Sequence, residues 1–112
     1  MFGNKLDKIS KLAAKRDAVK LAGFVGDGKP EVRLAAIDAL GKCEGDDAFN
    51  ALVPLIHHAD RDVRIHAAGA LSELKQPRSR PFLEHQLAQE KDAQVIKAID
   101  EALSKIKSDD NA

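Results

Sequence analysis

A ten-residue pattern that occurs three times is the feature that most constrains what this chain can fold into. Each copy has a valine near its start and small or apolar residues at fixed positions after it, and the copies span residues 31–40, 62–71 and 94–103. Their valines, Val32, Val63 and Val95, lie 31 and 32 residues apart. A nearly constant period of this length is typical of a protein built from stacked structural repeats.

Each copy of the pattern predicts one amphipathic helix. Its apolar residues recur at helical spacing, as in Val63, Ala67, Ala70, Leu71 and Leu74. A second helical run precedes each copy, and these runs end at residues 21–25, 52–56 and 83–87. The repeating unit is therefore predicted to be a helical hairpin.

The joints between the helices contain residues that stop or start helices. A glycine followed by acidic residues, Gly45, Asp46 and Asp47, predicts a helix end and then an acidic N-cap, and Ser79 is the expected N-cap of a later helix. Pro54 lies inside a predicted helix, where a proline removes a hydrogen bond and bends the axis.

Composition agrees with an all-α fold. The chain is 44% hydrophobic but only 4% aromatic, without Trp or Tyr, so its core must use Ala, Leu, Ile and Val at short helix–helix distances. We expect one domain over residues 1–112, an α-solenoid of about three hairpins with an N-terminal capping helix. The expected parts are the cap at 1–15, repeats at 16–45, 46–77 and 78–107, and a disordered tail at 108–112.

These features together resemble a known family. A first helix with an internal proline, an acidic turn, and a second helix that opens with Val-Arg are similar to the HEAT repeat family, particularly its short bacterial form of the type found in bilin lyases. The resemblance covers about residues 16–107 and implies a right-handed solenoid. In the third unit Ile96 replaces the Arg and Asp100 replaces Ala68, a polar change that suits a terminal cap.

Charge is unevenly distributed. Eighteen basic and eighteen acidic residues give a formal net charge of zero, which argues against a surface built as a whole to bind nucleic acid. Residues 1–26 nevertheless carry a net charge of +4, and residues 4–14 predict a basic amphipathic helix over the first repeat. Nucleic acid is therefore not the expected partner, and only the lysines of this basic helix favour it.

Two repeated arginines lie close to acidic turns. The resemblance implies that such arginines form an internal ladder with turn carboxylates of adjacent repeats, and repeated opposite charges are usually satisfied internally. An anion-binding site is the alternative. The predicted ladder residues are Arg33, Arg64, Asp27, Asp60 and Asp62.

A protein or peptide segment is the expected partner. Solenoids of this kind place their second helices along a concave surface that accepts such a segment. Leu34 and Ile65 occupy equivalent positions, and they either form an apolar strip there or pack between repeats. A homodimer through exposed repeat ends is the alternative. The predicted partner-binding residues are Leu34, Asp38, Ile65, His66, Gly69, Lys97 and Glu101.

No catalytic, metal or cofactor site is predicted. His57 and His58 are adjacent, and none of the four histidines has the i, i+4 spacing of a helical zinc site. The His-Glu dipeptides with which one HEAT-like hydroxylase holds iron are absent. Cys43 is expected to be a buried hydrophobe. The alternative to a non-enzymatic scaffold is an accessory subunit of a lyase or hydroxylase, since the fold alone carries no activity.

A cytoplasmic location is expected. The single cysteine permits no intrachain disulfide, which suits a reducing compartment. The first residues lead into charged positions without the apolar segment of a signal peptide, and no stretch approaches transmembrane length, so membrane insertion is not expected.

Overall fold

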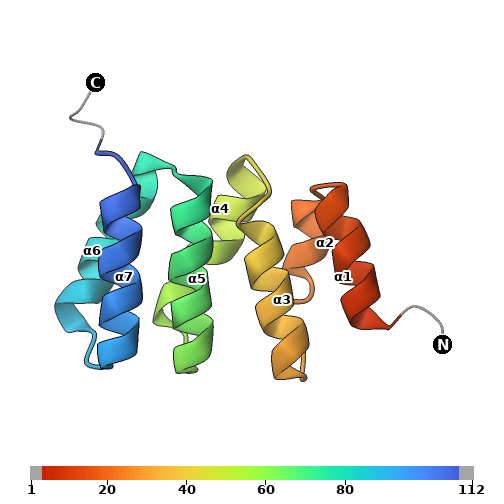
Figure 1. Ribbon diagram of the computed structural model, residues 1–112, viewed down its shortest axis with the longest axis horizontal. Coiled ribbons are helices and arrows are strands. Elements are labelled where there is room, and N and C mark those ends of the chain that lie inside the picture. Colours follow the sequence, from red (N-terminus) through yellow and green to blue (C-terminus); the bar gives the residue numbers. More distant parts are fainter. Residues whose placement is uncertain (1–3, 109–112) are drawn as a thin grey trace.

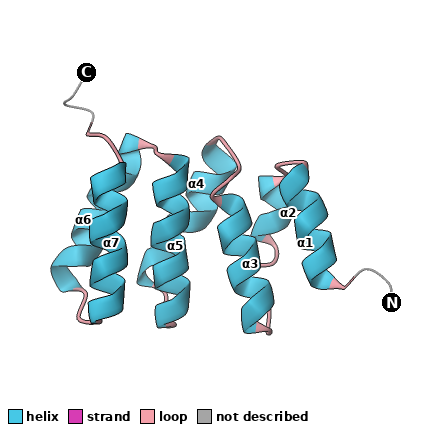
Figure 2. Ribbon diagram, in the orientation of Figure 1, coloured by secondary structure: helices cyan, strands magenta, loops and turns pink. Residues whose placement is uncertain are grey.

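The computed structural model describes residues 4–108, and these form two layers of helices without a strand. The first layer contains α1 (Lys5–Ala14), α3 (Pro30–Leu40), α5 (Arg61–Leu74) and α7 (Ala93–Lys105). The second layer contains α2 (Ala18–Ala22), α4 (Asp46–Leu52) with the 3₁₀ helix η1 (Val53–His57), and the 3₁₀ turn η2 (Pro77–Ser79) with α6 (Arg80–Gln89). Figure 2 shows that short loops connect the helices. The expected all-α helical repeat fold is confirmed. Of the predicted tail, 109–112 lies outside the described residues.

The first helix extends the first layer. Figure 1 shows α1, α3, α5 and α7 side by side, with their amino-terminal ends at the same edge. α1 packs against both α3 and α2, and it buries Ile9 and Leu12. α1 thus stands next to α3 as a second helix of a repeat would stand, and it covers the apolar side of α3 as a cap must.

The core lies between the two layers. Leu21, Leu52 and Leu83 occupy equivalent positions in α2, α4 and α6, and all three are completely buried. In the first layer Ala36 and Ala67 are also completely buried. Small side chains at these positions let neighbouring helices approach closely, which explains how a core without Trp or Tyr is filled.

Pro54 changes the type of helix. α4 ends at Leu52, and the chain continues as the 3₁₀ helix η1 with Pro54 in its first turn. Proline has no backbone N–H to donate to the carbonyl four residues earlier, so the α-helical hydrogen-bond pattern cannot continue through it. The bend expected from the sequence is therefore a transition from α to 3₁₀ geometry.

Two expected helix caps differ from the sequence prediction. Gly45, at φ 96°, is itself the N-cap of α4, and Asp46 and Asp47 lie in the first turn of that helix. The left-handed φ explains the glycine, because side chains disfavour that region. Ser79 precedes α6 as predicted, but its backbone is helical and its hydroxyl makes no capping hydrogen bond.

Gly41 is needed where α3 approaches α5. A Cβ atom at Gly41 would lie 2.9 Å from the Cα and 3.0 Å from the Cβ of Ala70. Its φ of −61° is one that any residue adopts, so the close approach of the two helices, rather than backbone conformation, requires glycine. By contrast, a Cβ at Gly69, inside α5, would have nothing within 4 Å.

Gly41→Ala is therefore expected to destabilise the protein by about 1–3 kcal/mol, because the added methyl group must push α5 away. Gly69→Ala is the matched control. It should stabilise the protein by about 0.5–1 kcal/mol, because alanine has the higher helix propensity and meets no atom there. Urea unfolding measures the free energy of unfolding of both variants. Equal changes in this free energy would contradict the close approach of α3 and α5 at Gly41.

Ser79→Ala is expected to raise the free energy of unfolding by about 1 kcal/mol. Ser79 is completely buried, and its Oγ has no hydrogen-bond partner, so the native state carries an unsatisfied polar group that alanine removes. Thermal unfolding followed by circular dichroism measures the effect. Ser104→Ala is the control, because Ser104 Oγ is exposed and donates to the Glu101 carbonyl. A lower melting temperature for Ser79→Ala would contradict the conclusion that the Ser79 hydroxyl has no hydrogen-bond partner.

Candidate functional site

Three basic side chains of the first layer each contact an acidic residue in a turn that comes later in the chain. Lys5 Nζ lies 2.7 Å from Asp27 Oδ2 in the turn before α3. Arg33 on α3 lies 3.7 Å from Asp60 in the turn before α5, and it also donates to the carbonyl of Asp27 at 2.7 Å. These contacts and the Arg64 contact described next form the ladder, in which each cation links one hairpin to the next.

The ladder contact with the most hydrogen bonds joins Arg64 on α5 to Glu90 in the turn before α7. Arg64 Nε donates to Glu90 Oε1 at 3.0 Å and Arg64 Nη2 donates to Oε2 at 3.2 Å, a bidentate pair. Arg64 Nη1 also donates to the carbonyls of His58 and Ala59. The side chain of Glu90 is only 4% exposed. Such shielding makes the pairing structurally important, because an unpaired buried charge is costly.

The ladder differs from the sequence prediction in its members. Asp62 was expected in it, but Asp62 pairs with its neighbour Arg61 at 3.3 Å. Arg61 also pairs with Asp92 across the same inter-repeat boundary at 2.8 Å. Lys5 and Glu90 were missed. The missed signal is the distance along the chain, because the ladder arginines Arg33 and Arg64 pair with acids 27 and 26 residues later rather than with carboxylates of their own turns.

The turn carboxylates have lowered pKa values. Arg61, through its hydrogen bond, holds the pKa of Asp92 at about 2. The Lys5 hydrogen bond lowers the pKa of Asp27, and the backbone N–H of Asp62 lowers that of Asp60. Burial opposes ionisation of Glu90, but hydrogen bonds from Gln86, the Asp92 backbone and Arg64 outweigh it and lower the pKa.

We therefore expect stability to fall in acid. Carboxyl groups with a lowered folded-state pKa stabilise the fold above their unfolded values of about 4, and this contribution is lost as the pH falls through the folded values toward about 2. Urea midpoints measured at pH 6 and pH 3 test this. Asp92→Asn keeps an N-cap side chain but loses the charge, so its midpoint should change less with pH, whereas equal changes in both proteins would contradict the assignment.

Two of the four histidines, His58 and His66, make separate contacts. His66 Nδ1 on α5 lies 2.8 Å from Asp38 Oδ1 on α3, whereas His58 Nδ1 accepts a hydrogen bond from the Asp60 backbone at 3.0 Å. Across residues 4–108, no group of three or more His, Cys, Asp and Glu is arranged to hold a metal ion. Cys43 is buried, and burial raises the pKa of its thiol.

All of the predicted partner-binding residues belong to the first layer. Leu34 and Asp38 lie on α3; Ile65, His66 and Gly69 on α5; Lys97 and Glu101 on α7. Leu34 and Ile65 are half-buried and pack against the core. Each of these two side chains therefore contributes to the core and keeps part of its surface exposed.

A hollow of about 230 Å³ lies between α5 and α7. It brings together three of the predicted residues, Ile65, Gly69 and Glu101. Sequence reasoning missed the other residues that line it, which are Ser72, Glu73, Ala98, Ala102 and Lys105. We refer to it below as the α5–α7 hollow.

The sequence suggests why the α5–α7 hollow lies at this boundary. Ser72 stands nine residues after Val63, as Gly41 stands nine residues after Val32. Gly41 lets α3 lie directly against Ala70, whereas a serine at the equivalent place on α5 needs room for its side chain. Ser72 accordingly lines the α5–α7 hollow, whereas the equivalent Gly41 lies against Ala70 of the next helix.

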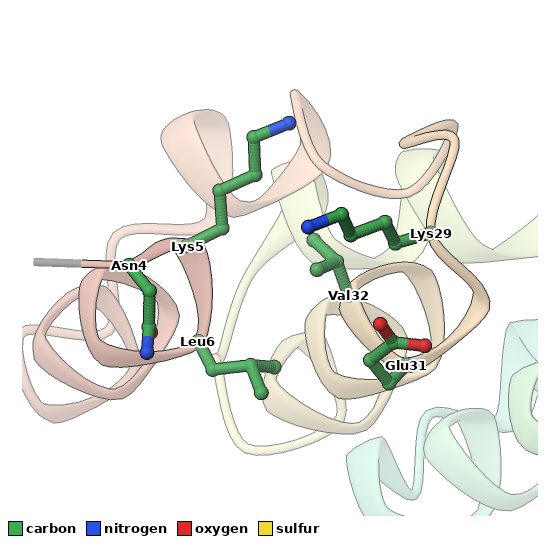
Figure 3. A pocket seen from close by; sticks show the side chains of 6 residues that line it. All are labelled: Asn4, Lys5, Leu6, Lys29, Glu31 and Val32. Atoms are coloured by element: carbon green, nitrogen blue, oxygen red, sulfur yellow. The ribbon is translucent and has the colours of Figure 1, made fainter.

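A second, larger hollow of about 380 Å³ lies at the start of α1 and α3. Figure 3 shows the side chains that line it, Asn4, Lys5 and Leu6 from α1 and its N-cap, and Lys29, Glu31 and Val32 from the start of α3. Leu6 is 41% exposed. Lys5 at its rim belongs to the ladder.

The second layer also has an exposed apolar region that sequence reasoning missed. Phe82 on α6 is 46% exposed, and its ring packs edge-on against Phe49 on α4, with ring centroids 6.1 Å apart. The guanidinium of Arg78 lies 4.0 Å from the centre of the Phe49 ring. We refer to these three residues as the outer cluster.

Comparison with known families decides what kind of protein this is. The family model described as HEAT repeats matches residues 18–109. The chain belongs to the HEAT repeat family. No curated protein matches the sequence of this HEAT repeat protein. Over residues 4–108, no helix of the HEAT stack is both long and apolar enough to cross a membrane. The helices from α2 to α7 thus form a HEAT repeat stack.

Proposed function

We propose that this HEAT repeat protein is a non-enzymatic interaction module whose first layer binds a segment of another protein. HEAT repeats are commonly protein-interaction modules. The observation that supports a site on the first layer is the α5–α7 hollow, where predicted partner-binding residues from two successive repeats meet. Gly69 also supports a site here. A glycine inside a helix costs stability, and here the missing side chain leaves room for an approaching ligand.

Photo-crosslinking tests which face binds. A photoreactive phenylalanine analogue replaces Lys97 in one variant and Val19 in the other, and the proteins are irradiated in the cells that make them. Lys97 is an exposed residue of α7 that does not line the α5–α7 hollow, so the analogue leaves the hollow open and the variant should fold. Val19 is 66% exposed on α2 of the second layer, so it is a matched control. We expect a discrete crosslinked product from position 97 and none from position 19.

Two further outcomes are informative. Ile65→Lys in the background of the position-97 variant should remove the crosslinked product, since it places a positive charge on the apolar wall of the α5–α7 hollow. A product of twice the chain mass would identify the partner as a second copy, which is the homodimer alternative. Crosslinks only from position 19 would show that the second layer binds the partner. Loss of binding with Phe82→Ala but not with Ile65→Lys would show that the outer cluster binds instead.

A further inference from the structure

The α5–α7 hollow contains a polar group that the fold does not use. Ser72 lines the hollow and is only 7% exposed. Its hydroxyl makes no hydrogen bond within residues 4–108, unlike that of Ser104 at the equivalent position on α7, which donates to a backbone carbonyl. Among the described residues, the one buried side-chain oxygen without a partner is Ser79 Oγ. Ser72 Oγ is therefore open to solvent through the hollow and can accept a hydrogen bond from a ligand that enters it.

The walls of the α5–α7 hollow suit the stem of one long side chain. Ile65 on α5 and Ala98 and Ala102 on α7 are apolar, and at Gly69 a Cβ would meet nothing within 4 Å. At about 230 Å³ the space is smaller than the roughly 300–1,000 Å³ of pockets that bind drug-sized molecules. It is therefore better matched to a single inserted side chain than to a cofactor.

The charged residues around the hollow favour a positive ligand. Glu73 on α5 and Glu101 on α7 are exposed, and neither carboxylate has an ion-pair partner among the described residues. Lys105 lines the same space and is likewise unpaired there. Two carboxylates and one ammonium group leave a net negative charge, which repels anions and attracts a cation.

We propose that the α5–α7 hollow receives one lysine or arginine side chain from the partner segment. The methylene stem lies along Ile65 and Ala98 and passes over Gly69, while the charged end pairs with Glu73 and Glu101 and donates a hydrogen bond to Ser72 Oγ. Long basic side chains combine an apolar stem with a charged end, and charge-assisted hydrogen bonds are strong. This inference rests on the proposed function, because it assumes that a protein segment binds the first layer.

Nuclear magnetic resonance titration with defined peptides tests the ligand class. The probes are acetyl-Gly-Ala-Lys-Ala-Gly-amide, its arginine analogue, and the same lysine peptide acetylated on the side chain. We expect saturable shifts of the Gly69, Ser72 and Glu101 amides with the two basic peptides. Acetylation should weaken binding about tenfold, because it removes a charge-assisted interaction. Absence of these shifts, or equal binding of the acetylated peptide, would overturn the proposal.

Variants with opposite charge effects make the test specific. Glu101→Gln should weaken binding of the lysine peptide about three- to tenfold, and Lys105→Gln should strengthen it by up to about fivefold, because a competing cation is removed. Gly69→Leu should abolish binding by filling the hollow while its circular dichroism melt stays cooperative. Unchanged affinity in all three variants would overturn the proposal.

The two proposals can fail separately. If position 97 crosslinks to a partner, and neither Glu101→Gln nor Lys105→Gln alters that product or the peptide titration, the first layer binds protein but the basic side chain is the wrong ligand. If the lysine peptide binds and Gly69→Leu removes that binding, but crosslinks form only from the second layer, the hollow binds a cation and the proposed function fails.

Discussion

Ala67→Asp is expected to abolish cooperative folding. Ala67 is completely buried in α5, which packs between α3 and α7 in the first layer. An aspartate there lacks space, and its carboxylate would be buried without a partner. Its expected cost of more than about 4 kcal/mol is a large part of the 5–15 kcal/mol that stabilises typical domains. Thermal unfolding followed by circular dichroism measures the effect.

The control for this variant is Ala93→Asp. Ala93 is an exposed alanine in the first turn of α7, where an acidic residue interacts favourably with the helix terminus. It should melt within a few degrees of the natural protein. If Ala67→Asp also melted cooperatively near the natural temperature, the assignment of Ala67 to the buried face of α5 would be wrong.

Arg64→Ala is expected to destabilise the protein by about 3 kcal/mol, which for a domain of this size lowers the melting temperature by roughly 10–20 °C. The substitution removes both hydrogen bonds to Glu90 and those to the carbonyls of His58 and Ala59. It also leaves the shielded Glu90 carboxylate without its cation. Urea unfolding at neutral pH provides the measurement.

Arg61→Ala is the matched control for this rung. Arg61 joins the same two repeats through Asp92, but its side chain is 46% exposed, so solvent screens the pair and the loss should be much smaller. The double variant Arg64→Ala with Glu90→Ala should lose less than the sum of the single losses, because the two side chains interact directly. If Arg64→Ala cost no more than Arg61→Ala, Arg64 would be free to bind an anion instead.

Much of this fold could be predicted because the sequence repeats. Equivalent valines, alanines and leucines specify which faces of the helices are buried, and a family of stacked hairpins follows from their period. The position of α1 was harder to predict, because residues 4–14 have no preceding hairpin partner and their pattern reveals a buried face but not a neighbour. Its place in the first layer depends on packing against α3.

The candidate site was less predictable than the fold. Ile65, Gly69 and Glu101 could be predicted as partner-binding residues because the apolar pattern of each helix leaves them outside its buried face. That pattern concerns a single helix and does not show how two helices are spaced. Ser72 and Ala102 were missed because both are nearly buried, and only the spacing between α5 and α7 shows that they line a hollow. Glu90 was missed for a similar reason, since its partner is on another repeat.

The common direction of the first-layer helices has an electrostatic consequence. Because α1, α3, α5 and α7 begin at one edge, the positive ends of their macrodipoles gather there. The carboxylates of Asp27, Asp60 and Asp92 lie in the turns at this edge, and the last two accept hydrogen bonds from the first backbone N–H groups of their helices. The partial charges that attract phosphate in other proteins are thus offset within the fold. The charge of a binding partner is therefore expected to affect its affinity more along the exposed sides of these helices than at their amino-terminal ends.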